Sequence, residues 1–482
     1  MKGQLIAVIF GIIIVIASCS QSDSNNPTLQ KQRINSEIGM GNYTIADSLI
    51  NIYIASESIE DEDKMAMEFE QERMKRIRLD FNKNEAQIRT RLEEYYPDLT
   101  DSQMRKWEGD NDLEMKVIDG ERMYFWNASR NLFRVNKEAK KIYQAEKKQS
   151  DNNYDFRIEY APGFIEELQE NGGTGSKDYT FKINYELEID SGVVKAGDTI
   201  RCWLPFPRPD KNRLKNIELI STSDPNYILA PETMLHRSIY FERVATNDHP
   251  APFVVDYQYT AIGQWFGHKL DEIKPYNTNS ELYIKYTGER ETHIIFTDEI
   301  KHLADSIVGD KTEPYEIVQA LYTWIDSNFP WASAREYSTI VNIPSYALDN
   351  MHADCGIHTL LFATMARYKG IPAKWQSGWM LMPGEVNLHD WAEVYYEGLG
   401  WVPVDQSFGL IDSDDDNVKN FYTCGIDPYR LIVNDDYSQE FYPAKKHFRS
   451  ETVDFQRGEV EVSDRNIYFN QWTYYLSIDY VE

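Results

Sequence analysis

The chain has 482 residues, a length typical of about three domains. Hydrophobic residues make up 42% and charged residues 27%, a balance that indicates folded globular domains and not a disordered chain. The formal net charge of −28 argues against a nucleic-acid partner, because an acidic surface repels phosphates. A mean hydropathy of −0.57 excludes a polytopic membrane protein, and four cysteines are too few for a disulfide-rich scaffold.

The N-terminal 18 residues have the pattern of an export signal. Lys2 precedes an apolar run from Leu5 to Ile16, which is too short for a membrane span and is typical of a signal h-region. Small residues then lie directly before Cys19, and this pattern resembles the signal of bacterial lipoproteins. The resemblance implies cleavage after residue 18, acylation of Cys19 and a lipid-anchored protein of the cell envelope that faces the periplasm or the exterior. Ser20 favours the outer membrane, and an uncleaved N-terminal anchor is the alternative.

The next stretch divides into a tether, a helical region and a boundary. Residues 19–27 are small and polar and predict a flexible tether. Residues 28–170 space their apolar side chains mostly three or four apart, which predicts helices. Three glycines between Glu170 and Lys177 then indicate a domain boundary.

Apolar residues alternate with polar ones after this boundary, which predicts a β-sandwich over residues 177–300. Turn residues separate the alternating segments, as they do in sandwiches. The predicted strands are Tyr179–Asp190, Thr199–Pro205, Asn216–Ser221, Ser238–Phe241, Phe253–Ala261 and Leu282–Tyr286.

Helical and strand patterns are mixed over residues 312–410, which predicts an α+β core. Helices are expected at Glu313–Phe329 and Cys355–Tyr368, because each has a continuous apolar face. Three strands are expected next, at Ala373–Met382, His389–Glu397 and Trp401–Asp405. Residues 411–482 predict a β-rich extension that packs on this core, with extended segments at Tyr429–Val433 and Asn466–Ile478.

Three residues of the core combine into a candidate catalytic site. Cys355 begins a predicted helix, where free N–H groups and the positive helix end favour a thiolate nucleophile. His389 is able to take the thiol proton, and Asp405 is expected beside it on an adjacent antiparallel strand, where a carboxylate orients the imidazole. The same spacing, taken alone, also fits a buried and inert cysteine.

Three sequence blocks around these residues strengthen the catalytic interpretation. They are Ala353–Gly356 with the later Gly370–Ala373, then His389–Val394, then Gly400–Asp405. In this order they resemble the cysteine helix, histidine strand and aspartate strand of the transglutaminase-like superfamily. The resemblance implies a papain-like α+β core over residues 312–410.

The same resemblance implies a role for each member of the triad. Cys355 is the nucleophile, His389 the general base and then the general acid, and Asp405 the orienting acid. Ala353 departs from the glycine that the family often has at that position. The implied activity is cleavage or transfer of peptide or protein amides through a thioester, as a peptidase, an amidase or an acyltransferase. No cofactor and no metal is implied, and a protein or peptide substrate is the expected partner.

Three further residues are candidates for the lining of the substrate site. They are Trp331, which precedes the cysteine, His358, which follows it by one helical turn, and Trp391, which lies in the histidine block. A core or rim position is favoured for Trp331, and a position on the helix face beside the site is favoured for His358.

Four alternative interpretations remain open from the sequence. His352, Cys355 and His358 have a spacing that a metal could use, but no fourth ligand follows at a usual zinc spacing. The acidic run at 412–416 starts like a calcium loop but lacks its glycine and its terminal glutamate, so a solvated loop is favoured. Cys202 and Cys424 lie in different predicted domains, which disfavours a disulfide between them. In the fourth alternative, the whole chain is a catalytically silent binding or scaffold module.

Overall fold

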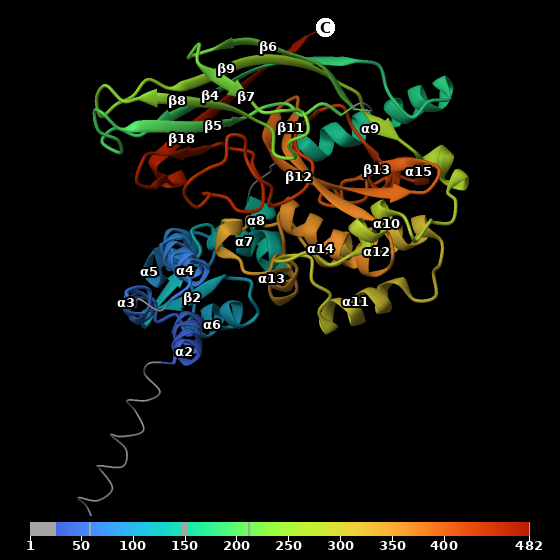
Figure 1. Cartoon of the computed structure of the whole chain (residues 1–482). Helices are drawn as coiled ribbons and strands as arrows, with labels where there is room; N and C mark the ends of the chain where they lie inside the picture. Colours follow the sequence, from blue (N-terminus) through green and yellow to red (C-terminus); the bar gives the residue numbers. More distant parts are fainter. Residues whose placement is uncertain (1–25, 57–58, 147–151, 211–212, 482) are drawn as a thin grey trace, which may run out of the picture. The chain divides into compact units, whose positions relative to one another are not determined.

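The computed structural model describes residues 26–56, 59–146, 152–210 and 213–481. The predicted signal, Cys19 and most of the predicted tether lie outside these residues. The chain divides into two compact units, residues 1–136 and residues 137–482, and Figure 1 draws both. No helix within the described ranges is long and apolar enough to cross a membrane.

The first unit consists of six described helices and a small sheet. The helices are α2 (Pro27–Gly39), α3 (Tyr43–Ile54), α4 (Asp61–Asp80), α5 (Glu85–Leu92), α6 (Asp101–Gly109) and α7 (Ala128–Val135). The strands β1 (Lys83–Asn84), β2 (Met115–Ile118) and β3 (Glu121–Tyr124) form an antiparallel sheet in the order β1-β3-β2. The helices agree with the helical pattern of the sequence, and the small sheet was not expected from it. Asp119 and Gly120 both have positive φ, which suits the tight turn of the β2–β3 hairpin.

Two helices of the predicted N-terminal region belong to the second unit. These are α8 (Lys137–Glu146) and α9 (Asn152–Asn171), so the predicted region 28–170 spans the division between the units. One stripe of α9 enters the core of the second unit, because it spaces its apolar residues by three and four. The stripe consists of Ala161, Phe164, Ile165 and Leu168.

A β-sandwich forms much of the second unit. One sheet has the order β18-β4-β9-β6, from Trp472–Val481, Tyr179–Ile189, Phe253–Ala261 and Leu214–Thr222. The other has the order β17-β16-β5-β8-β7, from Asn466–Ile467, Glu459–Glu461, Thr199–Pro205, Ser238–Val244 and Tyr227–Leu229. Figure 1 shows red strands from the C-terminus among the green sandwich strands.

The sandwich therefore differs from the prediction in its limits. The C-terminal strand β18 pairs with β4 along ten residues, from Trp472 opposite Ile189 to Val481 opposite Thr180. The tail is thus not a separate extension on the core, because its strands complete sheets begun almost three hundred residues earlier. The predicted strand Leu282–Tyr286 is the helix α10 (Glu281–Thr287), in which Ser280 caps the first turn.

The α+β core contains a four-stranded antiparallel sheet in the order β13-β12-β11-β15. Its strands are Gly400–Val404, Glu385–Tyr396, Ala373–Met382 and Arg430–Asn434. Helices α11 (Asp298–Val308), α12 (Pro314–Asn328), α13 (Ile343–Asn350) and α14 (Cys355–Tyr368) pack in the same cluster. The core thus begins before the predicted position 312.

Both faces of this sheet are buried. Ala392 and Val394 of β12 pack with the helices, whereas Trp379 of β11 and Trp391 of β12 pack with the sandwich. Every residue of β11 is buried. The strand lies between β12 and β15, and the helices and the sandwich cover the two faces of the sheet. The sheet therefore holds the helices and the sandwich at fixed positions around the triad residues.

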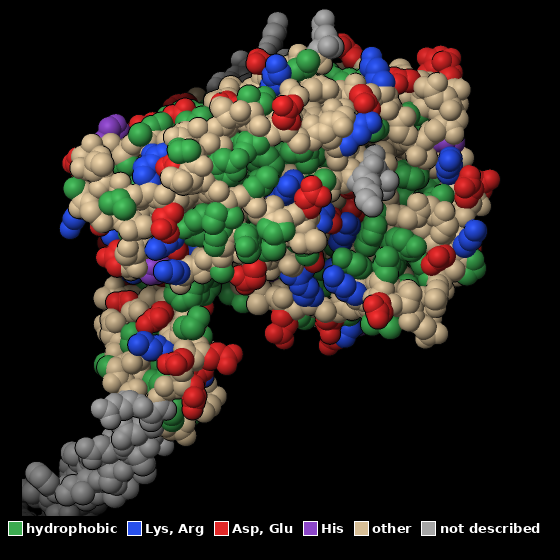
Figure 2. All heavy atoms as spheres, turned by 45° about the horizontal axis from the view of Figure 1, so that its top comes forward, with side chains coloured by type: hydrophobic (Ala, Val, Ile, Leu, Met, Phe, Trp, Pro, Cys, Tyr) green, Lys and Arg blue, Asp and Glu red, His purple; other side chains and the backbone are tan. Residues whose placement is uncertain are grey.

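Short elements connect these layers. They are η1 (Gly267–Glu272), η2 (Tyr337–Thr339), α15 (Asp416–Lys419), η3 (Phe421–Thr423), η4 (Phe469–Gln471), and the paired strands β10 (Gln264–Trp265) and β14 (Gly425–Ile426). Figure 2 turns the top of Figure 1 toward the reader and shows hydrophobic side chains gathered between charged side chains of both signs on the visible face of the second unit.

Candidate active site

Cys355 is the first residue of α14, and its neighbours anchor the start of that helix. The side chain of Asp354 accepts a hydrogen bond from the backbone N–H of Ile357 at 3.0 Å, as a helix N-cap does. Tyr337 donates its hydroxyl proton to the same carboxylate at 2.9 Å. Gly356 leaves room for this tyrosine, since a Cβ at that position would overlap the Tyr337 hydroxyl.

The thiol of Cys355 donates to a carboxylate and not to the histidine. Its Sγ lies 3.2 Å from Oδ2 of Asp390, and among the described residues no hydrogen bond joins it to His389. Burial raises the pKa of this thiol well above its usual value, and the charges of Asp390 and Asp354 raise it further. The expectation that the helix N-terminus yields a resting thiolate is therefore wrong, because burial and two carboxylates outweigh the helix end.

His389 lies in the middle of β12 and faces Asp405, as the antiparallel strand pairing predicted. The strand β13 pairs with β12, with Val404 opposite Ala392, and Nε2 of His389 lies 2.7 Å from Oδ2 of Asp405. Burial lowers the pKa of His389 and outweighs the opposite effect of Asp405. The resting imidazole is therefore neutral.

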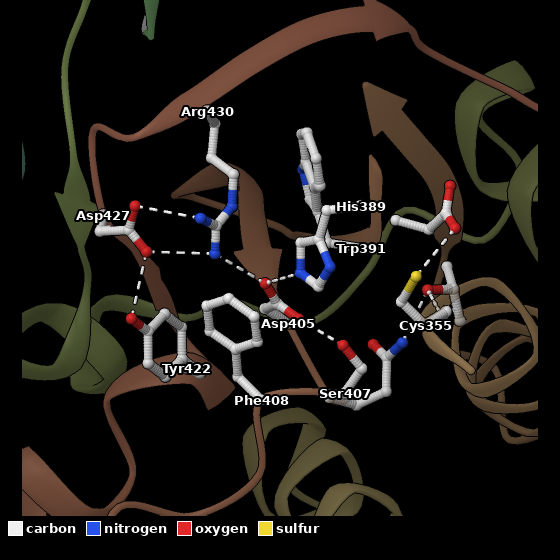
Figure 3. A network of polar contacts seen from close by, with 12 residues as sticks. Cys355, His389, Trp391, Asp405, Ser407, Phe408, Tyr422, Asp427 and Arg430 are labelled. Atoms are coloured by element: carbon white, nitrogen blue, oxygen red, sulfur yellow. Dashed lines mark hydrogen bonds and ion pairs between the residues drawn. The ribbon is translucent and has the colours of Figure 1, made fainter. Parts of the chain in front are cut away.

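The neutral imidazole has a defined tautomer. Asp405 is ionised and only accepts, so the ring proton lies on Nε2 and Nδ1 keeps its lone pair. Figure 3 shows the ring between Asp405 and Cys355, with its second nitrogen turned toward the side of the cysteine. Trp391 and Phe408 hold this orientation, with ring centroids 6.0 and 4.6 Å from that of His389.

Arg430 is a fourth member of the network, and sequence reasoning missed it. Its guanidinium lies 2.9 Å from Oδ2 of Asp405 and 3.1 Å from Asp427, which also accepts from the hydroxyl of Tyr422 (Figure 3). Burial acts to raise the pKa of Asp405, but His389 and Arg430 outweigh burial and hold the pKa below its usual value. Nothing near Arg430 in the sequence marks this role, because the residue comes from a strand of the tail.

The three candidate lining residues have different surroundings. Trp331 is 42% exposed and forms an isolated β-bridge with Ala353, two residues before the cysteine. His358 is buried, its Nε2 lies 3.1 Å from the carbonyl oxygen of Phe329, and burial lowers its pKa to about 4. Trp391 is fully buried and donates to the side chain of Gln376, so it packs against the ring of His389 and is not part of an open wall.

The other sequence candidates form no second site among the described residues. Among the described residues, no group of three or more His, Cys, Asp or Glu side chains is arranged to hold a metal ion. The acidic run at 412–416 is mostly exposed, and Asp415 caps the short helix α15. Cys202 and Cys424 are both buried free thiols.

Residues 301–406 match the family model of the transglutaminase-like superfamily. The chain carries a transglutaminase-like domain. The match extends from α11 through β13 and includes Cys355, His389 and Asp405, the residues on which the sequence resemblance rested. Arg430 and Asp427 lie outside the matched range. No curated protein matches the chain.

Solved bacterial structures resemble the chain only distantly. A candidate cysteine protease from Cytophaga hutchinsonii is 13% identical, with a TM-score of 0.42, over 64% of this chain and 92% of that one. The periplasmic domain of TgpA from Pseudomonas aeruginosa is 12% identical, with a TM-score of 0.28, over 48% and 88%. A candidate protease from Parabacteroides distasonis is 11% identical, with a TM-score of 0.21, over 46% of each chain. The transglutaminase-like domain is thus assigned by its sequence match.

Proposed function

We propose that this protein is a transglutaminase-like cysteine enzyme that acts on peptide or protein amides through a thioester on Cys355. The observation that carries the proposal is the pairing of His389 with Asp405 at 2.7 Å, with the free imidazole nitrogen turned toward the side of Cys355. A neutral imidazole with an unprotonated Nδ1 is able to act as a general base. The ionised Asp405 stabilises the imidazolium that forms, as the third member of a triad does.

The proposed reaction has two halves. The thiol proton passes to Nδ1 of His389, and the sulfur attacks the amide carbonyl, so the S–C bond forms as the C–N bond breaks. His389 returns the proton to the leaving amine or ammonia. Water or a second amine then attacks the thioester and regenerates Cys355. Water gives hydrolysis or deamidation, whereas an amine gives a transferred or cross-linked product. The backbone N–H of Cys355 is the first candidate donor to the oxyanion.

We further propose that the protein acts in the bacterial cell envelope, held by a lipid on Cys19. The lipoprotein-like signal that ends at Ser18 supports this location, and Ser20 supports the outer membrane. The expected partners are a protein or peptide substrate and the membrane itself. Radiolabelled palmitate incorporated into the wild type but not into Cys19→Ala is the expected result, and equal labelling of both would contradict the anchor.

The acyl-enzyme is the most direct test of the enzymatic proposal. The protein is incubated with a pool of glutamine-containing peptides, quenched in acid and mapped by mass spectrometry. We expect an acyl adduct on Cys355 in the wild type and in His302→Ala, which removes an exposed histidine of α11. We expect none in Cys355→Ala or His389→Ala. The masses of the released peptides distinguish the outcomes, because proteolysis shortens chains and cross-linking joins them.

A catalytically silent binding module is the second candidate. The resting thiol favours it, since its sulfur contacts Asp390 and burial raises the pKa of the thiol. A silent module forms no adduct on Cys355 with any peptide in the pool. It also predicts that cells carrying Cys355→Ala behave as wild-type cells do.

A further inference from the structure

Asp390 is the polar group that contacts the sulfur of Cys355, and the proposed reaction has no use for it. Its Oδ2 lies 3.2 Å from Sγ of Cys355, and its Oδ1 accepts from the side-chain amide of Gln456 at 2.8 Å. Gln456 also donates to the backbone oxygen of His389 at 3.0 Å. Both oxygens of this buried carboxyl group are therefore held in place, and one of them is held against the nucleophile.

The surroundings of Asp390 are crowded with acids. The titratable and charged groups that face it or its immediate neighbours come from α14, from the segment around η2 and from the loop before β16. They are Cys355, Asp354, Tyr337, Glu336, Glu451, Asp454, Arg457 and Arg449. Arg457 is paired with Glu336, so its charge is balanced by that carboxylate. Acidic groups thus outnumber basic groups beside the nucleophile.

This crowding opposes the loss of protons from both partners. Burial raises the pKa of Asp390 well above its usual value, and the charges of Asp454 and Asp354 raise it further. The pKa of Cys355 is raised by burial and then by Asp390, whereas the backbone N–H of Asp390 acts in the opposite direction. At least one proton therefore lies between Sγ of Cys355 and Oδ2 of Asp390. This hydrogen bond directs the sulfur toward Asp390 instead of His389.

We propose that Asp390 is a further catalytic residue, which binds the Cys355 thiol in the resting enzyme and keeps it protonated until the sulfur turns to His389. This inference rests on the proposed function, since it assigns a resting state to the same nucleophile. On activation, the hydrogen bond to Asp390 breaks, the S–H proton moves to Nδ1 of His389, and the electron pair stays on the sulfur. Asp390 keeps its own contact with Gln456 throughout.

Two groups of the site are suited to this turn. Nδ1 of His389 keeps its lone pair, and the ring is fixed by Trp391 and Phe408, so the acceptor is in place before the sulfur moves. Side-chain rotation about one bond of a cysteine is fast compared with catalysis. The resting enzyme is thereby protected from alkylation and oxidation, which require the thiolate.

The test is the pH dependence of Cys355 alkylation by iodoacetamide, followed by peptide mapping. Asp390→Asn keeps the oxygen that Gln456 binds and replaces the oxygen at the sulfur with an N–H donor. We expect its alkylation midpoint to fall by about 1–3 pH units relative to the wild type, the range over which a close charge shifts a neighbouring group. Asp310→Asn, an exposed position outside the site, is the matched control and leaves the midpoint unchanged.

Further measurements keep the proposal testable if the Asn variant does not fold. Cys202 and Cys424 are buried and report the fold in the same sample, because they react only when the protein opens. The wild-type midpoint is measured in addition, and it lies above the ordinary thiol value of about 8.5 if Asp390 holds the proton. A wild-type midpoint below that value, or an unchanged midpoint in a folded Asp390→Asn, overturns the proposal.

Failure of this inference is distinguishable from failure of the proposed function. An acyl adduct on wild-type Cys355 together with an unchanged midpoint in Asp390→Asn rejects only the role of Asp390. A lowered midpoint in Asp390→Asn without any acyl adduct in the wild type supports the resting contact and rejects the enzyme.

Discussion

Arg430→Met removes the only guanidinium that contacts Asp405 among the described residues. Arg430 is 3% exposed, and its charge balances Asp405 at 2.9 Å and Asp427 at 3.1 Å. Methionine fills similar space between Phe408 and Trp391, so the loss is mainly electrostatic. After the change, Asp427 keeps only neutral hydrogen-bond donors, including the hydroxyl of Tyr422.

The expected loss follows from leaving buried carboxylates without their cation. Removal of one partner from a buried ion pair typically costs about 3–5 kcal/mol of unfolding free energy. We expect Arg430→Met to lie in that range. Addition of Asp427→Asn to the same chain removes one of the two unpaired charges. The double variant is therefore expected to be more stable than Arg430→Met alone.

Hydrogen exchange of β12 and β13 peptides at increasing urea concentrations measures this loss in the second unit alone. Arg465→Met is the control, because Arg465 and Asp464 are largely exposed and their pair contributes about 1 kcal/mol or less. A loss for Arg430→Met as small as that of the control would refute the reasoning. The same variant is also expected to raise the pKa of His389, since the charge of Arg430 lowers it; NMR titration of the imidazole measures the shift.

Three further predictions concern a glycine of the cysteine helix, a glycine of α9 and one of the acids near Asp390. Gly356→Ala is expected to cost about 1–3 kcal/mol and to slow acylation, because its Cβ would overlap the Tyr337 hydroxyl and lie 2.8 Å from the ring of Trp375. Gly163→Ala in α9 has open space around it and is expected to stabilise the protein by about 0.5–1 kcal/mol, measured by the same urea series; a loss there would show that the glycine is needed. Burial raises the pKa of Asp454 to about 7, so its contribution to stability is full below about pH 4 and is lost as pH rises through 7. The stability of Asp454→Asn relative to wild type is therefore expected to rise by a few kcal/mol between pH 4 and 8, and a difference independent of pH would contradict the assignment.

Local sequence patterns were sufficient for many elements of the fold. The alternation in Tyr179–Asp190 predicted β4, and the continuous apolar face of Cys355–Tyr368 predicted α14. These patterns succeed because a strand or helix with one buried face repeats its own period in the sequence. The same kind of pattern wrongly predicted a strand at Leu282–Tyr286, which lies in the helix α10. A helix of seven residues is too short for its period to be distinguished from that of a strand.

The candidate triad was also accessible from the sequence, and its electrostatics were not. Asp405 was expected beside His389 because two short antiparallel strands follow one another along the chain. The sequence also predicted a thiolate at Cys355, but burial and the carboxylates of Asp354 and Asp390 reverse that prediction. Charges that approach from other elements are invisible to a local pattern.

The amino-acid sequence by itself determined the strand and helix periods, the order of the three transglutaminase-like blocks and the three residues of the candidate triad. Only the tertiary structure decided that β18 completes the sheet of β4, that Arg430 holds Asp405, and that Asp390 holds the thiol of Cys355. The physical reason is the range of the interactions. Periodicity is a property of neighbouring residues, whereas strand pairing, ion pairing and burial depend on residues brought together from distant parts of the chain.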